Sequence, residues 1–371
     1  MPLKSFLRNG GFLAAFLALA PTAAFAQQQT ADQQVLATAG TTRGVSPLVV
    51  PLPMADPSLG NGLVVASALF YSPVQGGRPW VTGVGGLYTN NKDWGILMLQ
   101  QADLMNGHLR LSGAGGYGDF NLNFFGIGQA AGSRGVSIKL NETGEVLVLN
   151  GLYQVHGQFY AGLRYRFLSE TTKLAEPIFP NHPILPDAQF TTRISGLGPA
   201  FEYDSRNVQF QPSKGLYIEG QWLFDGKGLG SSFTYDKLTL SANAYFPLGP
   251  RTVFAMRGSV CDAGGGAPFY DLCFFGSNHD LRGYEGGRYR DSAMLAGQME
   301  LRQHLFWRLG AVAFGGVGGV GKSVTDLGEA LPAGGLGLRL QPSRKLPVNV
   351  SIDYAWGKNS EGLYLYVGEA F

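Results

Sequence analysis

Charged residues are scarce in this chain. Lys, Arg, Asp and Glu together make up 15% of its 371 residues, against about 25% in an average soluble domain. Glycine contributes 55 residues and aromatic side chains 12%, whereas disordered chains have few aromatics and many charges. The composition therefore excludes both a disordered chain and an ordinary soluble globule.

Long apolar runs are missing from most of the chain. After residue 26, no apolar run approaches the roughly 20 residues that a transmembrane helix needs. The hydrocarbon of a bilayer offers the backbone no hydrogen bonds, so the remaining structure that can span it is a closed β-barrel. If this protein enters a membrane, we expect it to do so as a barrel.

Motifs that carry enzyme, metal or nucleotide chemistry are also lacking. The five His residues show no metal-ligand spacing, and no Gly-x-Ser-x-Gly element supplies a lipase-like nucleophile. Residues 316–323 formally match the Gly-x-x-x-x-Gly-Lys-Ser phosphate loop. A turn-rich stretch follows Ser323, however, where a phosphate site needs the N-terminus of a helix. We therefore expect no catalytic residue, cofactor, metal, nucleotide or nucleic acid.

The first 26 residues have the layout of a cleaved secretory signal. Two basic residues precede a short apolar stretch at 11–20, and Ala24 and Ala26 form a small-x-small cleavage site. An apolar stretch of about ten residues is too short for a membrane anchor. We expect an exported protein that begins near Gln27, with residues 27–60 as a short flexible periplasmic lead-in.

Several segments alternate between two kinds of side chain. In residues 158–167, aromatic and aliphatic residues occupy one face, while polar residues such as Arg164 and Arg166 occupy the other. Residues 216–222 and 348–356 show the same alternation. A soluble β-sandwich would alternate too, but the polar face here carries charges of both signs. That is typical of the water-filled lumen of a transmembrane β-barrel.

Turn signals divide the chain into about sixteen predicted strands. They cover residues 62–71, 79–89, 92–102, 107–118, 134–141, 144–155, 158–168, 190–204, 214–225, 232–246, 250–262, 291–304, 306–318, 331–341, 346–356 and 361–371. Residues 134–155 also fit one long strand. The prediction is thus an all-β, antiparallel transmembrane barrel over residues 61–371. An even number of strands places both of its ends on the periplasmic side.

The connections between these strands fall into two classes. Tight ones, such as Asn90 with Asn91 and residues 247–249, fit short periplasmic turns. Long ones, at residues 170–188 and 263–290, fit extracellular loops. The second long loop holds the most informative motif of the chain.

That motif reads Leu281, Arg282, Gly283 and Tyr284. It resembles the (Val/Leu)-Arg-Gly-(Phe/Tyr) motif of the BamA and TamA family of outer-membrane barrels, also called bacterial surface antigens. In that family the motif lies in the loop between strands eleven and twelve, which is its predicted place here. The resemblance implies a long extracellular loop folded into the lumen, with Arg282 inserted, Gly283 allowing a tight reversal and Tyr284 packed on the wall.

Three further elements resemble the same family or its relatives. Tyr203, Asp204 and Arg206 are similar to the family's Tyr-Asp-(Ser/Thr)-Arg turn. Residues 124–128 are similar to its Phe-Tyr-Gly-Ile-Gly element. Phe371, at the end of an alternating segment, is similar to the C-terminal aromatic signature of Gram-negative outer-membrane barrels.

The lumen partner of Arg282 must differ from that of the family. Relatives carry an acid on strand thirteen, where this chain has Gly316. Glu300 and Arg302 share the polar face of predicted strand twelve, so both are candidate lumen residues. We predict that Glu300 pairs with Arg282, because an unpaired buried charge would be costly. A solvent-exposed Arg282 is the alternative.

The two cysteines, Cys261 and Cys273, flank the base of the same loop. In an exported protein a disulfide between them is the natural interpretation, and two unpaired buried thiols are the alternative.

The resemblance implies a protein that inserts or translocates client outer-membrane or secreted polypeptides. It would lie in lipid, in the cell outer membrane of a Gram-negative bacterium, with a weak seam between its first and last strands as a lateral exit. Family members normally carry periplasmic POTRA domains, and residues 27–60 are too few for one. The alternative function is a passive or gated pore, because a polar lumen of mixed sign suits a pore equally well.

Overall fold

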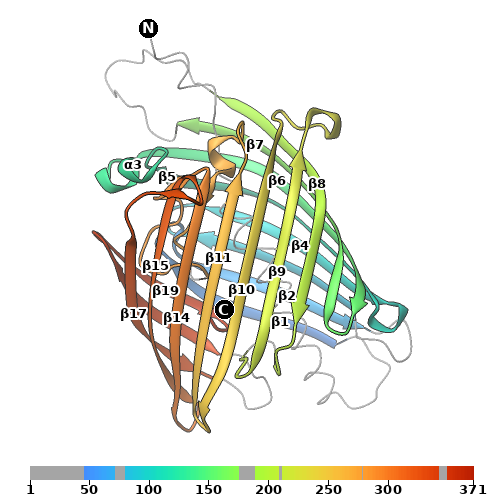
Figure 1. The fold of residues 1–371 in the computed structure, drawn as a ribbon, viewed down its shortest axis with the longest axis vertical. Coiled ribbons are helices and arrows are strands. Elements are labelled where there is room, and N and C mark those ends of the chain that lie inside the picture. Colours follow the sequence, from blue (N-terminus) through green and yellow to red (C-terminus); the bar gives the residue numbers. More distant parts are fainter. Residues whose placement is uncertain (1–45, 72–79, 175–188, 209–210, 278, 342–348) are drawn as a thin grey trace.

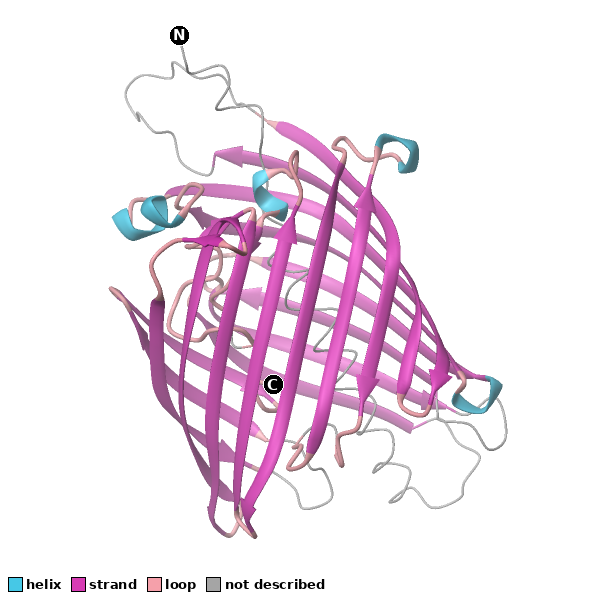
Figure 2. Ribbon diagram, viewed as in Figure 1, coloured by secondary structure: helices cyan, strands magenta, loops and turns pink. Residues whose placement is uncertain are grey.

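The computed structural model describes the chain except for residues 1–45, 72–79, 175–188, 209–210, 278 and 342–348. The predicted signal at 1–26 lies outside the described residues. Nearly all regular structure that is described is β-strand (Figure 2). Among its short helices are α3 (Gln129–Arg134) and the single turn η4 (Phe269–Asp271). None of the described helices is long and apolar enough to cross a membrane.

Sixteen strands form the wall of a closed antiparallel barrel (Figure 1). They are β1 (Ser46–Asp56), β2 (Gly60–Tyr71), β3 (Trp80–Thr89), β4 (Trp94–Leu104), β5 (Leu109–Phe124), β6 (Ile138–His156), β7 (Phe159–Leu174), β8 (Phe190–Asp204), β9 (Gly215–Asp225), β10 (Tyr235–Gly249), β11 (Thr252–Ala263), β14 (Ala293–Phe306), β15 (Leu309–Ser323), β17 (Leu331–Leu340), β18 (Val350–Gly357) and β19 (Ser360–Val367). Each pairs with its neighbours along the chain, and β1 pairs with β19 to close the ring. The predicted closed antiparallel barrel is confirmed.

Two predictions about the strands are wrong, and the two errors cancel in the count. The segments 134–141 and 144–155 belong to the single strand β6, which pairs along its length with β5 and β7. The stretch 141–144 resembles a turn in sequence, but neighbouring strands hold its backbone on both sides. The second error is that β1 was not predicted: it occupies part of the predicted lead-in 27–60. It contains three prolines, which are uncommon within strands.

The missed first strand also reverses one prediction about turns. Asn90 and Asn91 follow the third wall strand, so they lie at the same end of the barrel as the loop after the eleventh. Two hydrogen bonds agree with this placement. The backbone N–H of Asn90 donates to the backbone oxygen of Asn61 at the start of β2. In the connection between β1 and β2, the Ser58 hydroxyl accepts from the N–H of Gly286, which belongs to the loop after the eleventh wall strand. The expected periplasmic turn at Asn90 is therefore a turn on the long-loop side.

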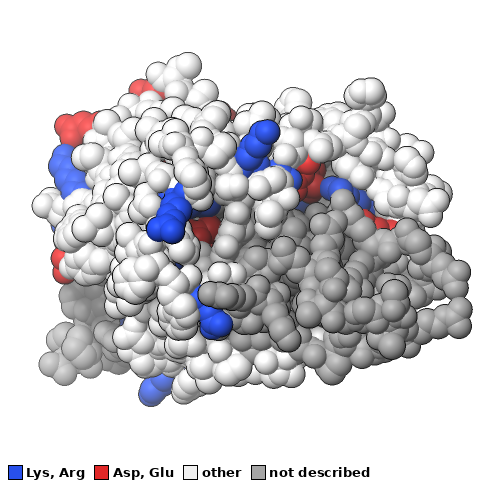
Figure 3. All heavy atoms as spheres, turned by 90° about the horizontal axis from the view of Figure 1, so that it is seen from below, with Lys and Arg blue, Asp and Glu red and all other residues white. Residues whose placement is uncertain are grey.

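The wall strands bury their polar side chains and expose their apolar ones. On β14, Gln298 is 2% exposed, Met299 53% and Glu300 1%. Outward aliphatic residues of this kind suit a hydrocarbon environment, and inward polar residues suit a barrel interior. Seen from below, most of the described surface carries no charge (Figure 3). Several charged side chains of the wall are instead buried, among them Arg166, Glu300 and Asp353.

Candidate functional site

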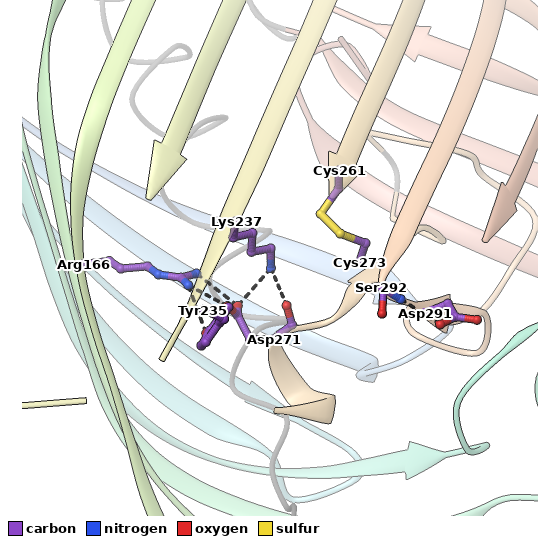
Figure 4. The surroundings of a disulfide bond; sticks show 8 residues. All are labelled: Arg166, Tyr235, Lys237, Cys261, Asp271, Cys273, Asp291 and Ser292. Carbon is purple, nitrogen blue, oxygen red and sulfur yellow. Dashed lines mark hydrogen bonds and ion pairs between the residues drawn. A yellow bond between two sulfur atoms is a disulfide. The ribbon is translucent and has the colours of Figure 1, made fainter. Parts of the chain in front are cut away.

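The loop between β11 and β14 spans residues 264–292, between the eleventh and twelfth wall strands, as predicted. It contains η4 and two short strands, β12 (Cys273–Phe274) and β13 (Arg290–Asp291), which pair with each other. Cys261, on β11, and Cys273 form a disulfide with their Cα atoms 5.6 Å apart. This covalent link fixes the first part of the loop to the wall (Figure 4).

Arg282 is fully buried and lies between two acids of the wall. Its guanidinium forms ion pairs with Glu300 of β14 and Asp353 of β18, and both carboxylates are also fully buried. The same guanidinium lies over the ring of Phe314 of β15, 3.5 Å from the ring centroid. Because charges removed from water need close partners of opposite sign, this enclosure compensates Arg282 on several sides. It is thus not the solvent-exposed residue of the alternative interpretation.

The two acids are themselves held by further cations. Arg302 Nε donates to Glu300 Oε1 at 2.7 Å, so Arg302 supports the partner of Arg282 instead of contacting Arg282. Asp353 forms an ion pair with Arg339 of β17 and accepts a hydrogen bond of 2.6 Å from the Tyr366 hydroxyl. The result is an alternating chain of cations and anions across β14, β17 and β18. Charge-assisted hydrogen bonds of this kind are the stronger ones in proteins.

Gly283 reverses the chain beside Arg282. Its φ is +111°, and a Cβ at this position would lie 2.9 Å from the backbone of Trp356. Its N–H donates to the hydroxyl of Tyr364 at 2.9 Å. Glycine is required here both by the backbone conformation and by the close approach of the wall.

Tyr284 and Leu281 fill the space on either side of that reversal. The Tyr284 hydroxyl donates to the backbone oxygen of Pro332 at 2.6 Å and accepts from the N–H of Lys358 at 2.9 Å. Leu281 is fully buried, and a Cβ on Gly316 would lie 2.9 Å from its Cδ1 atom. A Cβ there would also clash with a backbone oxygen of the neighbouring strand β14, so Gly316 accommodates both that strand and Leu281.

A second ion-paired anchor, which the sequence analysis missed, holds the start of the loop. Asp271 of η4 forms ion pairs with Arg166 of β7, at 2.6 Å, and with Lys237 of β10, at 2.9 Å. It also accepts a hydrogen bond of 2.6 Å from the Tyr235 hydroxyl (Figure 4). Arg166 forms a second ion pair, with Asp225. Burial alone would raise the pKa of Asp271, but the charges of Arg166 and Lys237 outweigh it and lower the pKa to about 2.

The end of the loop contacts the connection between β5 and β6, which holds the Phe-Phe-Gly-Ile-Gly element at 124–128. The N–H of Gly128 donates to the backbone oxygen of Arg290 at 2.7 Å. Arg288 Nε donates to the oxygen of Gly132 in α3 at 3.1 Å. Two elements that resemble the same family therefore lie against each other, although 156 residues separate Gly132 from Arg288 in sequence.

The last four residues also turn inward, which corrects the prediction for the C-terminus. The last strand ends at Val367 and not at Phe371, and Gly368 has a φ of +96°. Phe371 is buried against Tyr245 and Ala255 of β10 and β11. It therefore does not continue an alternating membrane strand as the C-terminal signature would.

Polar contacts tie this C-terminal tail, residues 368–371, to the same network. Arg302 Nη2 donates to the backbone oxygen of Phe371 at 2.6 Å, and Arg339 Nε donates to Glu369 at 2.8 Å. His279, in the loop, bonds to the backbone oxygen of Ala370 at 2.6 Å. The tail and the loop thus share their contacts on the wall.

The turn with Tyr203, Asp204 and Arg206 lies apart from this site. It follows the eighth wall strand, so it is at the opposite end of the barrel from the loop after the eleventh. Arg206 forms an ion pair with Asp204 at 2.8 Å and lies over the ring of Tyr217 at 4.1 Å. Tyr203 pairs through its backbone with β7 and β9. The motif is a local turn that joins β8 to β9.

The other candidate chemistries gain no support from the geometry. Residues 316–323 lie on β15, so the sequence that matches a phosphate loop is a wall strand with no helix after it. Within the described residues, no group of three or more His, Cys, Asp or Glu side chains could hold a metal ion.

Comparisons with known proteins agree with the architecture. No curated protein sequence matches the chain. Among solved structures, BamA from Haemophilus ducreyi lacking POTRA domains 1-3 is similar, with a TM-score of 0.61, 14% sequence identity, and coverage of 88% of this chain and 70% of that one. CdiB from Escherichia coli also has a TM-score of 0.61, at 11% identity, with coverage of 91% and 69%. CdiB from Acinetobacter baumannii has a TM-score of 0.55, at 11% identity, with coverage of 88% and 60%.

These identities are low, so the similar structures speak for the fold alone. The decisive comparison is with family models, in which residues 69–371 match the Omp85 superfamily domain. Proteins of this family take part in the insertion or translocation of client polypeptides at the outer membrane, and they are not enzymes. Since the match covers most of the chain and nearly all of the wall, this protein belongs to the Omp85 superfamily of outer-membrane β-barrels.

Proposed function

We propose that this chain is a polypeptide-inserting or polypeptide-translocating barrel of the BamA and TamA type, in which the loop 264–292 lies in the lumen as a removable obstruction. The observation that carries the proposal is the buried ion-pair set of Arg282 with Glu300 and Asp353. The same loop also contacts β7 and β10, on another part of the wall, through Asp271. We therefore infer that it narrows the path through the barrel.

The chemistry of the anchors supports a loop that can leave. Buried ion pairs are seldom the most stabilising way to fill a protein interior, because desolvation offsets most of their attraction. Charged groups regain favourable hydration when water or a polar chain reaches them. The ion-paired contacts of the loop can therefore be displaced by a polar client at a lower cost than its apolar contacts. A transition of such a segment between an ordered and a disordered state is a known way to switch a protein between two conformations.

A gated pore is the second candidate function, and one cavity favours it. Beside the Asp271 anchor there is a cavity of about 210 Å³. Arg164, Glu219 and Lys237 contribute to its lining. Charges of both signs around such a space suit small hydrated solutes as well as polypeptides.

We propose further that residues 1–26 are removed on export. The basic start, the short apolar stretch and the small-x-small site before Gln27 support this proposal. The mass of the protein isolated from outer membranes would then correspond to a chain beginning at Gln27. A full-length mass would refute the proposal.

Comparing outer-membrane and secreted proteomes tests the function. The source bacterium lacking this protein would be complemented with wild type, Arg282→Ala or the matched control Arg206→Ala, which removes an ion-paired Arg from a turn at the other end of the barrel. We expect selective loss of particular barrels or secreted proteins in the deletion strain. Wild type and Arg206→Ala should restore them, and Arg282→Ala should not.

Two outcomes would contradict this function. An unchanged proteome in the deletion strain would refute a role in insertion or translocation. If that were accompanied by single-channel conductance that rises when residues 276–289 are deleted, the gated pore would be the better account.

A further inference from the structure

The closure between β1 and β19 differs from every other pairing in the described wall. These two strands pair at a single position, Ala55 with Leu365. On its other side β1 pairs with β2 without a break from Ser46 to Asp56. Among the described residues, one edge of β1 is thus fully paired, while the other edge is paired at a single position.

Three prolines of β1 show which edge of the strand lacks hydrogen-bond donors. They are Pro47, Pro51 and Pro53, all at odd positions of β1. In a strand, the N–H groups of alternate residues point to opposite neighbours, and a proline facing a neighbour removes a hydrogen bond of that ladder. Because the ladder to β2 is unbroken, the prolines must face away from β2 and towards β19.

Pro199 of β8 shows what happens when a proline does face a neighbour in this barrel. The ladder from β8 to β7 continues through the pair of Pro199 with Leu163. The ladder from β8 to β9 has no partners recorded for Gly198 and Pro199, and resumes in register at Ala200. A proline here interrupts pairing only on the side to which its nitrogen points.

The same rule accounts for the inward turn of the C-terminal tail. Continuing the register from Ala55 and Leu365 would set Pro53 opposite Val367 and Pro51 opposite Glu369. Those two pairings would lack the donor from β1, leaving carbonyl groups of the last strand without partners at a lipid-facing seam. The last strand ends at Val367, and Glu369 instead accepts a hydrogen bond from Arg339.

The edge of β19 has no such defect. In an antiparallel ladder the residues that face β1 alternate with those that face β18, so Leu363 faces the seam as Leu365 does. Both keep their N–H groups, and the side chain of Leu363 is 45% exposed on the outer surface. This edge can bind an extended chain by strand addition, through the backbone N–H and C=O groups that face the seam.

We propose that the prolines of β1 prevent strand pairing on its outer edge, so that an extended polypeptide segment entering the seam is bound by the edge of β19. The proposal rests on the function proposed above for its occupant, but the state of the seam can be measured separately. Prolines on an exposed edge are a known protection against unwanted strand addition. Here the prolines leave the edge of β1 less able to pair with an added strand than the edge of β19.

The first experiment measures pairing across the seam by disulfide formation in isolated outer membranes. Val49→Cys and Phe371→Cys would face each other only if the tail straightened onto β1. We expect no cross-link between them in the proline-containing protein, and a cross-link when Pro51→Val and Pro53→Val are added. Ala55→Cys with Leu365→Cys, which are already partners, is the positive control and should cross-link in both backgrounds. A cross-link between 49 and 371 with the prolines present, or none without them, would overturn the proposal.

The second experiment asks which edge serves the client, with the deletion-strain proteome as readout. The matched control is Pro199→Val, which restores a donor between two strands inside the wall. We expect Pro199→Val to restore the missing proteins, and both Leu363→Pro and the Pro51→Val, Pro53→Val double variant to fail, provided that all three reach the membrane at wild-type levels. Full restoration by Leu363→Pro would refute binding at β19. A deletion strain with an unchanged proteome would refute the function, and the cross-links would still decide the state of the seam.

Discussion

The loop 264–292 is held at two places by ion pairs of opposite design. At its start an anion, Asp271, lies between two cations of the wall, Arg166 and Lys237. Near its middle a cation, Arg282, lies between two anions, Glu300 and Asp353. Both sets are balanced in formal charge once Asp225 joins the first, and Arg302, Arg339 and Glu369 join the second. Neutrality alone therefore does not distinguish them.

The two anchors differ in access to water and in what else they hold. The side chain of Lys237 is 13% exposed, whereas Arg282 and both of its acids are 0% exposed. A charge that loses its partner can turn to water at the first anchor and cannot do so at the second. The Arg282 network also continues to the C-terminal tail through Arg302 and Arg339, while the Asp271 anchor is supported locally by the disulfide at Cys273.

The largest effect should come from Arg282→Ala. It leaves one uncompensated negative charge among fully buried groups, which costs about 3–5 kcal/mol when one partner of a buried pair is removed. Urea unfolding of the refolded barrel in lipid vesicles would measure the loss, with Arg206→Ala as the control for removing an ion-paired Arg elsewhere. A double-mutant cycle with Glu300→Ala should be strongly non-additive. Additivity would mean that the two residues do not act as a pair.

The next largest effect should come from the disulfide. Replacing both Cys261 and Cys273 by Ser opens a covalent link across 12 residues, and a loop of this size contributes roughly 3 kcal/mol, often less. Unfolding under non-reducing conditions would measure the change. The double Ser variant should make the segment around Asp271 more sensitive to protease and leave the segment around Arg282 protected. Equal sensitivity at both segments would contradict the independence of the two anchors.

The same two anchors mark the limit of what the sequence reveals. Arg282 and Glu300 were predicted as a pair because a motif identified one and strand periodicity placed the other on the inward face. Asp271 has no motif, and its partner Arg166 was one of many inward charges. Asp353 lies in the alternating segment 348–356, but its closeness to Arg282 depends on the position of β18 around the barrel. Periodicity shows whether a side chain faces the lumen or the outside. Distances between side chains across the lumen depend on the register of all the strand pairs in the closed barrel.

Glycine and proline explain the remaining differences in the same way. In the sequence, Gly316 is notable only because relatives have an acid at that position. Its contact with Leu281 depends on the position of the loop, which the sequence does not give. The prolines of β1 would be unusual in a strand that is paired along both edges. A strand with one free edge escapes that rule.

A smaller effect is expected from Asp271→Asn. The amide keeps the size of the side chain and removes its charge, so Arg166 retains Asp225 while Lys237 can reach water. Loss of such charge-assisted hydrogen bonds costs about 1–3 kcal/mol. Urea unfolding would measure the change under the conditions used for Arg282→Ala. A loss as large as that of Arg282→Ala would show that access to water does not separate the anchors.

The smallest effect is the pH dependence that Asp271 alone should contribute. Its pKa is lowered from 3.8 to about 2 by Arg166 and Lys237, against the effect of burial. In that interval the unfolded chain binds a proton that the folded protein does not, so the contribution of Asp271 is fully present above about pH 4 and is lost as the pH falls towards 2. The difference in unfolding free energy between wild type and Asp271→Asn should therefore shrink over this interval, whereas the difference for Arg206→Ala measured beside it controls for general acid effects. A difference that stays constant from pH 5 to about 2 would mean that the cations of β7 and β10 do not hold the Asp271 carboxylate in its charged form.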